Sequence, residues 1–225
     1  MSELMLLSEK ILSYHFQLKP SGHLPSGIEW LLPYENKETR RCMTLFYDRY
    51  YNDERKRIFI LGINPGRFGA GITGIPFTDP IRLESLGIEN SFRKLQELSS
   101  VFIYDMIKDQ GGPKIFYSTY YIASLSPLGF VKDGKNYNYY DERALTEAVR
   151  PFIIRNLETQ IKFGADLSKV YCLGQGKNYE FLKQLNQEHK WWKEVIPLPH
   201  PRWIMQYKLK KKDVYLTMYK DLLNG

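Results

Sequence analysis

Four short apolar runs, separated by stretches of helical pattern, limit what this chain can fold into more than any other feature of its sequence. The runs cover residues 57–62, 120–125, 169–173 and 194–198. Runs of this length without polar alternation are typical of strands buried on both faces of a sheet. Helical patterns separate or follow them at residues 91–98, 143–163, 177–189 and 210–223. This alternation predicts an α/β fold with a central parallel four-stranded sheet flanked by helices.

The part of the chain before the first run is expected to be helical with one loop. Apolar side chains at helical spacing predict an amphipathic helix at residues 3–18, and a second helix is expected at residues 37–51. Between them, residues 20–33 are rich in proline and glycine and predict a loop. Within the 143–163 stretch, Pro151 predicts a break near Arg150. A length of 225 residues fits a single domain spanning residues 1–225.

Composition excludes several classes of protein. With 43% hydrophobic and 25% charged residues, the chain has enough apolar mass to close a core, which excludes disorder as the dominant state. No apolar run approaches the roughly 18 residues of a membrane span. Charged residues among the first leucines argue against a secretory signal. Cys42 and Cys172 are the only cysteines, so a disulfide framework or a four-cysteine metal site is excluded, and we expect a cytoplasmic location.

Positive charge is concentrated near the end of the chain. The formal net charge is +7, and residues 167–225 hold eleven Lys or Arg against five acids. Lys208, Lys210, Lys211 and Lys212 belong to this basic end. It favours an anionic partner, with nucleic acid first and a membrane surface second. The alternative is a solvated basic face with no partner.

The loop after the first run carries the clearest candidate chemistry, because parallel α/β sheets bind ligands beyond the carboxyl ends of their strands. Residues 62–80 read GINPGRFGAGITGIPFTDP and contain five glycines, which favours close approach of the backbone to a ligand. The amide of Asn64 can both donate and accept a hydrogen bond. Phe77 follows Pro76 and could stack on a planar ligand. The alternative is a structural turn with Phe77 filling the core.

The loop after the last run, residues 197–207, reads PLPHPRWIMQY. Prolines on both sides of His200 restrict the backbone and hold the imidazole in one orientation. Arg202 and Trp203 follow, and a basic residue beside an aromatic one suits contact with a nucleic-acid backbone and stacking on a base. Alternatively, His200 is an ordinary satisfied residue and Trp203 anchors the core.

Two further segments have weaker signals. Residues 174–177 (GQGK) follow a predicted strand and open a predicted helix, so their amides could bind a phosphate. A purely structural turn is the alternative, and Tyr179 stands where the third glycine of a dinucleotide fingerprint belongs. The tyrosine-rich residues 137–140 suggest no particular chemistry.

The two sheet-end loops together resemble the uracil-DNA glycosylase superfamily, and within it the single-strand-selective monofunctional branch. GINPG and TGIPF are similar to the G-M-N-P-G and T-G-V-P-F motifs of that branch, and HPR is similar to its late H-P-S-P-R-N motif. The resemblance spans residues 57–207. It implies one α/β domain with a parallel four-stranded sheet that flips a damaged base out of DNA and hydrolyses its N-glycosidic bond.

The resemblance also implies roles for individual residues. Asn64 would position the attacking water, His200 would stabilise charge on the departing base, Phe77 would stack on that base, and Arg202 would lie in the segment that wedges into the duplex. The implied substrate-binding residues are Gly62, Ile63, Pro65, Gly66, Phe68, Phe77 and Ser124. The implied DNA-binding residues are Gly174, Gly176, Lys177, Arg202, Trp203 and Lys210. No metal or cofactor is expected, because leaving-group stabilisation carries the bond breaking.

Two departures from the branch bear on the substrate. Ser124 stands where the N-Y-C-P-L motif of the branch has its base-reading asparagine, and the late motif lacks a Ser-Pro pair. This variant pattern resembles a bacterial subgroup that acts on xanthine as well as uracil. We therefore expect a monomeric glycosylase acting on DNA that contains deaminated bases. The alternatives are a non-catalytic nucleic-acid-binding protein with the same fold and a nucleotide-binding α/β protein that uses residues 174–177.

Overall fold

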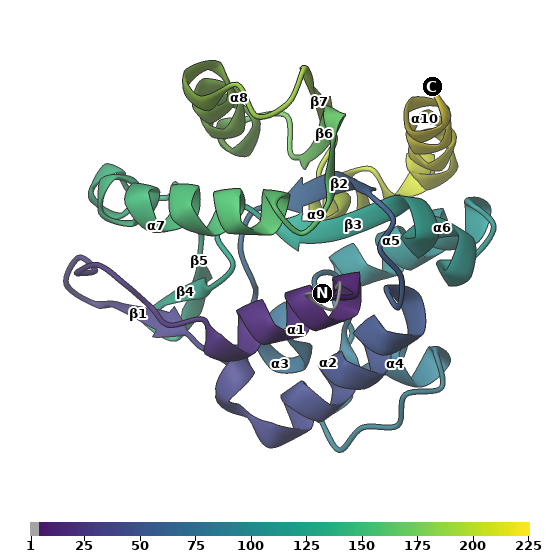
Figure 1. Ribbon diagram of the computed structural model, residues 1–225, viewed down its shortest axis with the longest axis horizontal. Coiled ribbons are helices and arrows are strands. Elements are labelled where there is room, and N and C mark those ends of the chain that lie inside the picture. Colours follow the sequence, from purple (N-terminus) through teal and green to yellow (C-terminus); the bar gives the residue numbers. More distant parts are fainter. Residues whose placement is uncertain (1–4) are drawn as a thin grey trace.

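Four parallel strands form the centre of the computed structural model, which describes residues 5–225 (Figure 1). Their order in the sheet is β3-β2-β6-β7. The strands are β2 (Arg57–Gly62), β3 (Tyr120–Ser124), β6 (Ala165–Leu173) and β7 (Glu194–Leu198). All three neighbouring pairs are parallel. The predicted α/β domain with a central parallel four-stranded sheet is confirmed.

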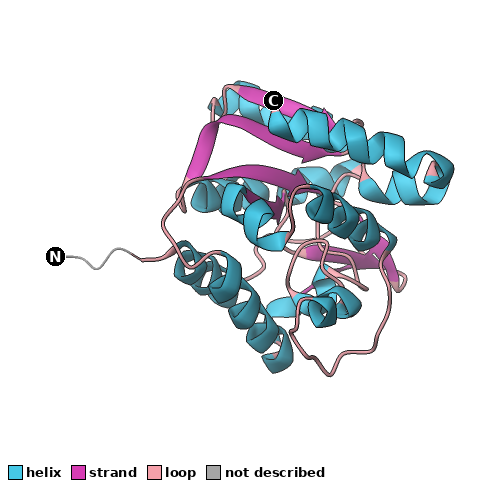
Figure 2. Cartoon of the chain, turned by 90° about the vertical axis from the view of Figure 1, so that its right-hand side faces the viewer, coloured by secondary structure: helices cyan, strands magenta, loops and turns pink. Residues whose placement is uncertain are grey.

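Helices cover both faces of this sheet (Figure 2). The α-helices are α1 (Leu7–Gln17), α2 (Lys37–Tyr50), α3 (Ala70–Thr73), α4 (Pro80–Ser85), α5 (Leu98–Asp109), α6 (Pro113–Thr119), α7 (Arg143–Ile161), α8 (Lys177–His189), α9 (Pro201–Tyr207) and α10 (Lys212–Asn224). Single 3-10 turns cover Pro33–Glu35 and Leu209–Lys211. The helices predicted at residues 37–51, 177–189 and 210–223 are confirmed within a few residues. The predicted start of the first helix, at residue 3, lies outside the described residues.

A second, antiparallel sheet was not predicted. It has the order β1-β4-β5, built from β1 (Ile28–Leu31), β4 (Gly129–Lys132) and β5 (Lys135–Tyr137). The prediction of a loop throughout residues 20–33 is therefore wrong for β1. This strand is only four residues long, and it is held by pairing with β4 and by the ring of Trp30, whose centroid lies 4.9 Å from that of Phe130. Such long-range contacts leave no local periodicity in the sequence.

Two predicted helices differ from the structure. The helix predicted at residues 91–98 is wrong, because residues 91–97 are not helical, and α5, which begins at Leu98, was not predicted. The start of α5 is set by Asp79, whose carboxylate accepts a hydrogen bond from the backbone N–H of Glu97 (2.9 Å) and another from the Ser100 hydroxyl. The predicted break at Pro151 is also absent, since α7 continues through it. Pro151 and Glu147 are exposed, so water can satisfy the carbonyl that proline leaves without a donor.

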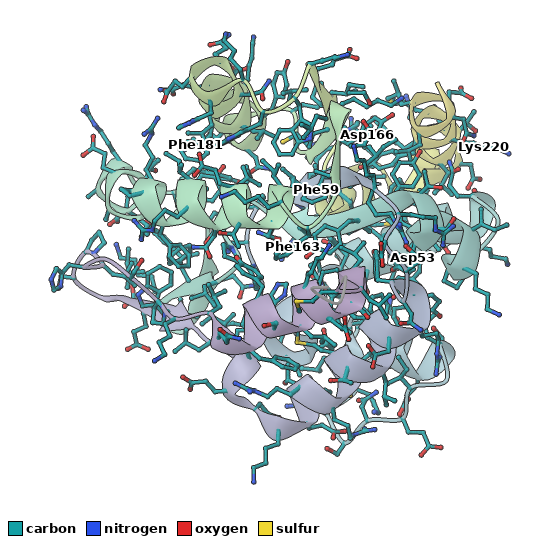
Figure 3. All side chains as sticks on the ribbon, in the orientation of Figure 1. Asp53, Phe59, Phe163, Asp166, Phe181 and Lys220 are labelled. Atoms are coloured by element: carbon teal, nitrogen blue, oxygen red, sulfur yellow. The ribbon has the colours of Figure 1, made fainter. Side chains whose placement is uncertain are left out.

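The core lies between the central sheet and its helices. Phe59, labelled in Figure 3, is 2% exposed and packs edge-on against Tyr121 with ring centroids 5.0 Å apart. Burial of each such side chain contributes roughly 1.5–3 kcal/mol. Because all four central strands are parallel, the loops after Gly62, Ser124, Leu173 and Leu198 meet at one edge of the sheet. No helix within residues 5–225 has the length and apolar character needed to cross a bilayer.

Candidate active site

The loop after β2 presses an aromatic ring onto the sheet edge. A Cβ atom added to Gly62 would lie 2.8 Å from Cε2 of Phe77, so only glycine lets the ring approach the backbone this closely. Phe77 has a φ of 54°, in the left-handed region that costs a non-glycine residue about 1–2 kcal/mol. The Thr73 hydroxyl holds the turn by donating to the carbonyl of Thr78 (2.6 Å). Such a held strain is common at functional sites.

The Asn64 side chain is fixed by the backbone at the end of β5 and just after it. Its Nδ2 donates to the carbonyl of Tyr137 at 3.2 Å, and its Oδ1 accepts from the backbone N–H of Tyr139 at 3.2 Å. These two bonds settle which way the amide points. The tyrosine-rich residues 137–140, for which the sequence predicted no chemistry, therefore orient Asn64 through their main chain.

His200 presents a neutral N–H donor. It is the N-cap of α9, and its Nδ1 accepts a hydrogen bond from the backbone N–H of Arg202 at 3.1 Å. An accepting Nδ1 leaves the ring proton on Nε2. Burial, and then the neighbouring Arg202 charge, lower the pKa of His200 to about 4. The imidazole therefore stays uncharged near neutral pH. Its ring centroid lies 6.1 Å from that of Phe77.

These side chains share one cleft of about 730 Å³. The cleft is lined by most of the predicted site residues, namely Ile63, Asn64, Gly66, Phe68, Phe77, His200, Arg202 and Trp203. It offers a planar ligand an aromatic face, a fixed amide and a neutral N–H donor. Within residues 5–225, no three His, Cys, Asp or Glu side chains lie close enough together to hold a metal ion.

A second cavity of about 340 Å³ adjoins the first. Gly174, Gly176 and Lys177 line it, and it shares Ile63, Tyr140, His200 and Trp203 with the larger cleft. Gly176 is the N-cap of α8, so the unpaired amides of the first helical turn lie at this cavity. The predicted DNA-binding residues of the two loops are thus neighbours.

A few predicted residues lie outside both cavities. Gly62, Pro65 and Ser124 are buried, and Ser124, 8% exposed, pairs in register with Gly62 at the sheet edge. Ser124 therefore lies next to the backbone that Phe77 covers. Lys210 is exposed on the 3-10 turn after α9.

The structure adds a carboxyl group that the sequence prediction missed. Glu97, the N-cap of α5, lines the larger cleft. Burial and the nearby Asp79 charge raise its pKa to about 7, while Arg202 acts in the opposite direction. Asn136 also lines the cleft, and its Oδ1 accepts from the backbone N–H of Arg67 at 2.9 Å. Neither residue belongs to a central strand or to the loop directly after one, so no sequence signal marked them.

Comparisons with known proteins agree with this geometry. A family model described as the Uracil DNA glycosylase superfamily matches residues 49–223. A solved structure titled "The crystal structure of WT Pedobacter heparinus SMUG2" is 44% identical in sequence and superimposes with a TM-score of 0.95. The match covers 99% of this chain and 100% of that one. A search of curated proteins gave no match.

Proposed function

Because the chain belongs to the uracil DNA glycosylase superfamily, we propose that it is a monofunctional DNA glycosylase that flips uracil and other deaminated bases, xanthine among them, out of DNA and hydrolyses the N-glycosidic bond. One observation carries the proposal. Asn64, Phe77 and His200, which come from loops more than 120 residues apart in sequence, line the same cleft at the carboxyl edge of the sheet. Extruding a base costs a few kcal/mol, which contacts in such a cleft must offset.

The three side chains have complementary tasks in this proposal. Phe77 stacks on the extruded base, and Asn64 orients a water molecule toward C1′ of the sugar. The C1′–N bond breaks with its electron pair leaving on the base, and the water oxygen forms the new bond to C1′ and gives up one proton. An amide is a poor base, so Asn64 positions the water without deprotonating it.

His200 acts on the leaving group. The departing base carries negative charge, and the Nε2–H of a neutral, pre-oriented imidazole can donate to its carbonyl oxygen as the charge develops. Removing one such donor costs about 3 kcal/mol in other enzymes that stabilise an oxyanion, which is roughly a hundredfold in rate. Because the pKa of His200 is lowered to about 4, this donor keeps the same charge across the neutral pH range.

DNA would be held along the rim of the cleft. Trp203 is 40% exposed and Tyr207 is 65% exposed, and both rings line it. Aromatic faces of this kind stack on unpaired bases, at about 1–3 kcal/mol per base. Arg202, Lys210 and the α8 amides beside Lys177 supply contacts for phosphates. A monomeric state and a cytoplasmic location stay predictions.

Incubation with a labelled uracil-containing oligonucleotide, followed by alkali, tests the proposal. We expect strand scission at the uracil position. Asn64→Ala should remove most of the activity and His200→Ala should slow the chemical step about a hundredfold, while Asn52→Ala, a change at an exposed asparagine outside the cleft, should match the wild type. Tight DNA binding without scission on uracil, hypoxanthine or xanthine would instead support the non-catalytic alternative.

A further inference from the structure

The Glu97 carboxyl is the one acidic group that lines the cleft together with Asn64 and His200 within residues 5–225. It enters from the start of α5, not from a loop at the sheet edge. Its side chain does not cap the helix, and among the described residues we find no hydrogen-bond donor or ion-pair partner for its oxygens. The side chain is only partly exposed to water. A carboxyl with reduced solvation and no partner in the protein is costly, so its presence in the cleft needs an explanation.

The position of this carboxyl is built by two other segments. A Cβ atom added to Gly69 would lie 1.9 Å from Oε2 of Glu97, which places the carboxyl directly against the loop that carries Asn64. On the other side, the Asp79 carboxylate accepts the backbone N–H of Glu97 at 2.9 Å and that of Arg82 at 2.8 Å. The bond to Asp79 fixes the backbone of Glu97, and neither contact neutralises the charge of its carboxyl.

The charged groups that face Glu97 set its protonation. Asp79, ahead of α4, repels the ionised form, and Arg202 on α9 favours it. Together with burial, they bring the pKa of Glu97 to about 7. Such a group can accept a proton at neutral pH and release it again, which an ordinary, fully ionised surface glutamate does poorly.

We propose that Glu97 is the proton acceptor of the hydrolysis, contacting the water that Asn64 orients; this rests on the function proposed above. As the water oxygen bonds to C1′ and the C1′–N electron pair leaves with the base, the water proton passes to the Glu97 carboxylate. The resulting carboxylic acid then returns the proton to solvent. Glu97 thereby supplies the basicity that the Asn64 amide lacks.

The test is the pH dependence of single-turnover uracil excision by the wild type, Glu97→Gln, Glu97→Asp and a control, Glu89→Gln. Glu89 is exposed and outside the cleft, so its change removes one negative charge without touching the site. We expect the wild-type rate to rise with pH to a plateau, with a midpoint near 7, because the deprotonated form is active. The excision rate of Glu97→Gln should be lower by about 10²- to 10⁴-fold, and its pH profile should lack the midpoint near 7. Glu97→Asp should keep a midpoint at reduced rate, and Glu89→Gln should behave like the wild type.

Several results would overturn the proposal. The first is a Glu97→Gln variant with the excision rate and pH profile of the wild type. The second is a Glu97→Gln variant whose rate falls equally at every pH and keeps the midpoint near 7, because a carboxyl with a purely structural role would give that result. Titration of His200 does not contribute to the pH profile near 7, because its pKa is lowered to about 4. A wild type inactive on uracil, hypoxanthine and xanthine would overturn the proposed function itself. A carboxyl ¹³C titration of the free enzyme needs no activity, and a midpoint near 4 for Glu97 would refute its role directly.

Discussion

Replacing Glu97 with glutamine should stabilise the fold, and the gain should depend on pH. The folded-state pKa of this carboxyl is raised, so the folded protein holds a proton there that the unfolded chain releases above about pH 4.5. Stability contributed by the protonated carboxyl is therefore complete below that pH and is lost as pH rises toward 7. Glutamine keeps the shape of the side chain but has no charge to bury.

The size of the effect follows from the same shift. A pKa raised from 4.5 to about 7 corresponds to a ceiling of about 3 kcal/mol, and solvent screening of the partly exposed carboxyl lowers our expectation to about 2 kcal/mol. The difference in unfolding free energy between Glu97→Gln and the wild type should be smallest near pH 5 and reach its full value near pH 8. Buried histidines such as His15 titrate in both proteins, so their contributions cancel in this difference.

Urea unfolding of both proteins in steps from about pH 5 to about pH 9 measures the difference, provided that both have the same denaturant slope. A constant difference across this range would show that Glu97 does not change protonation in the folded state near pH 7. A variant that becomes less stable than the wild type above pH 7 would show that the carboxylate has a favourable partner. Either outcome would refute the reasoning.

Three other changes test separate parts of the site. Gly62→Ala should destabilise the fold by about 1–3 kcal/mol and slow uracil excision, because the added Cβ would lie 2.8 Å from the Phe77 ring. A variant with wild-type values in urea unfolding and in single-turnover assays would contradict this. Lys210→Ala should flatten the plot of log DNA affinity against log salt more than Lys212→Ala does, because Lys212 is already ion-paired with Asp105 at 2.9 Å. Equal slopes for the two variants would place the phosphate contacts elsewhere. Ser124→Asn should narrow the range of excised bases toward uracil, because an asparagine amide both donates and accepts a hydrogen bond. If the wild type excises only uracil, and not xanthine or hypoxanthine, then Ser124 does not broaden the range of bases that the pocket accepts.

The central sheet could be predicted because each of its strands contains a contiguous apolar run, a signal that does not depend on the rest of the chain. The first half of β6 was missed because it includes Asp166 and Ser168 and is partly exposed. The small sheet could not, since β1 is only four residues long and owes its form to pairing with β4 and to the contact between Trp30 and Phe130. The start of α5 depended in the same way on Asp79, a residue 18 positions before Glu97 in sequence.

The candidate site could be predicted where its residues lie in segments that follow a central strand. Asn64 and His200 follow strands directly, and Phe77 lies further along the segment that Asn64 begins. The structure brings all three to one cleft as expected, although their roles stay proposals. Glu97 was missed because it enters the cleft from the start of α5, and the residue that fixes its backbone, Asp79, is far from it in sequence. Tyr137 and Tyr139 could not be predicted as site residues, because they orient Asn64 through backbone atoms that every residue type carries.

Asn64 is bonded to Tyr137, the last residue of β5, and to Tyr139 just after it, so the stability of the small sheet affects the active site on heating. Short strands of this kind open locally with a lower free energy than the global fold. Opening of β5 would remove the bond to the Tyr137 carbonyl, and an opening that extends through Tyr139 would remove both bonds that orient the amide, although the central sheet is still intact. Excision would then fail on heating before global unfolding begins, and amide hydrogen exchange at Tyr139 would report that opening. Substitutions at Trp30, whose ring stabilises β4, could therefore adapt the enzyme to a colder or warmer environment without altering any residue that meets DNA.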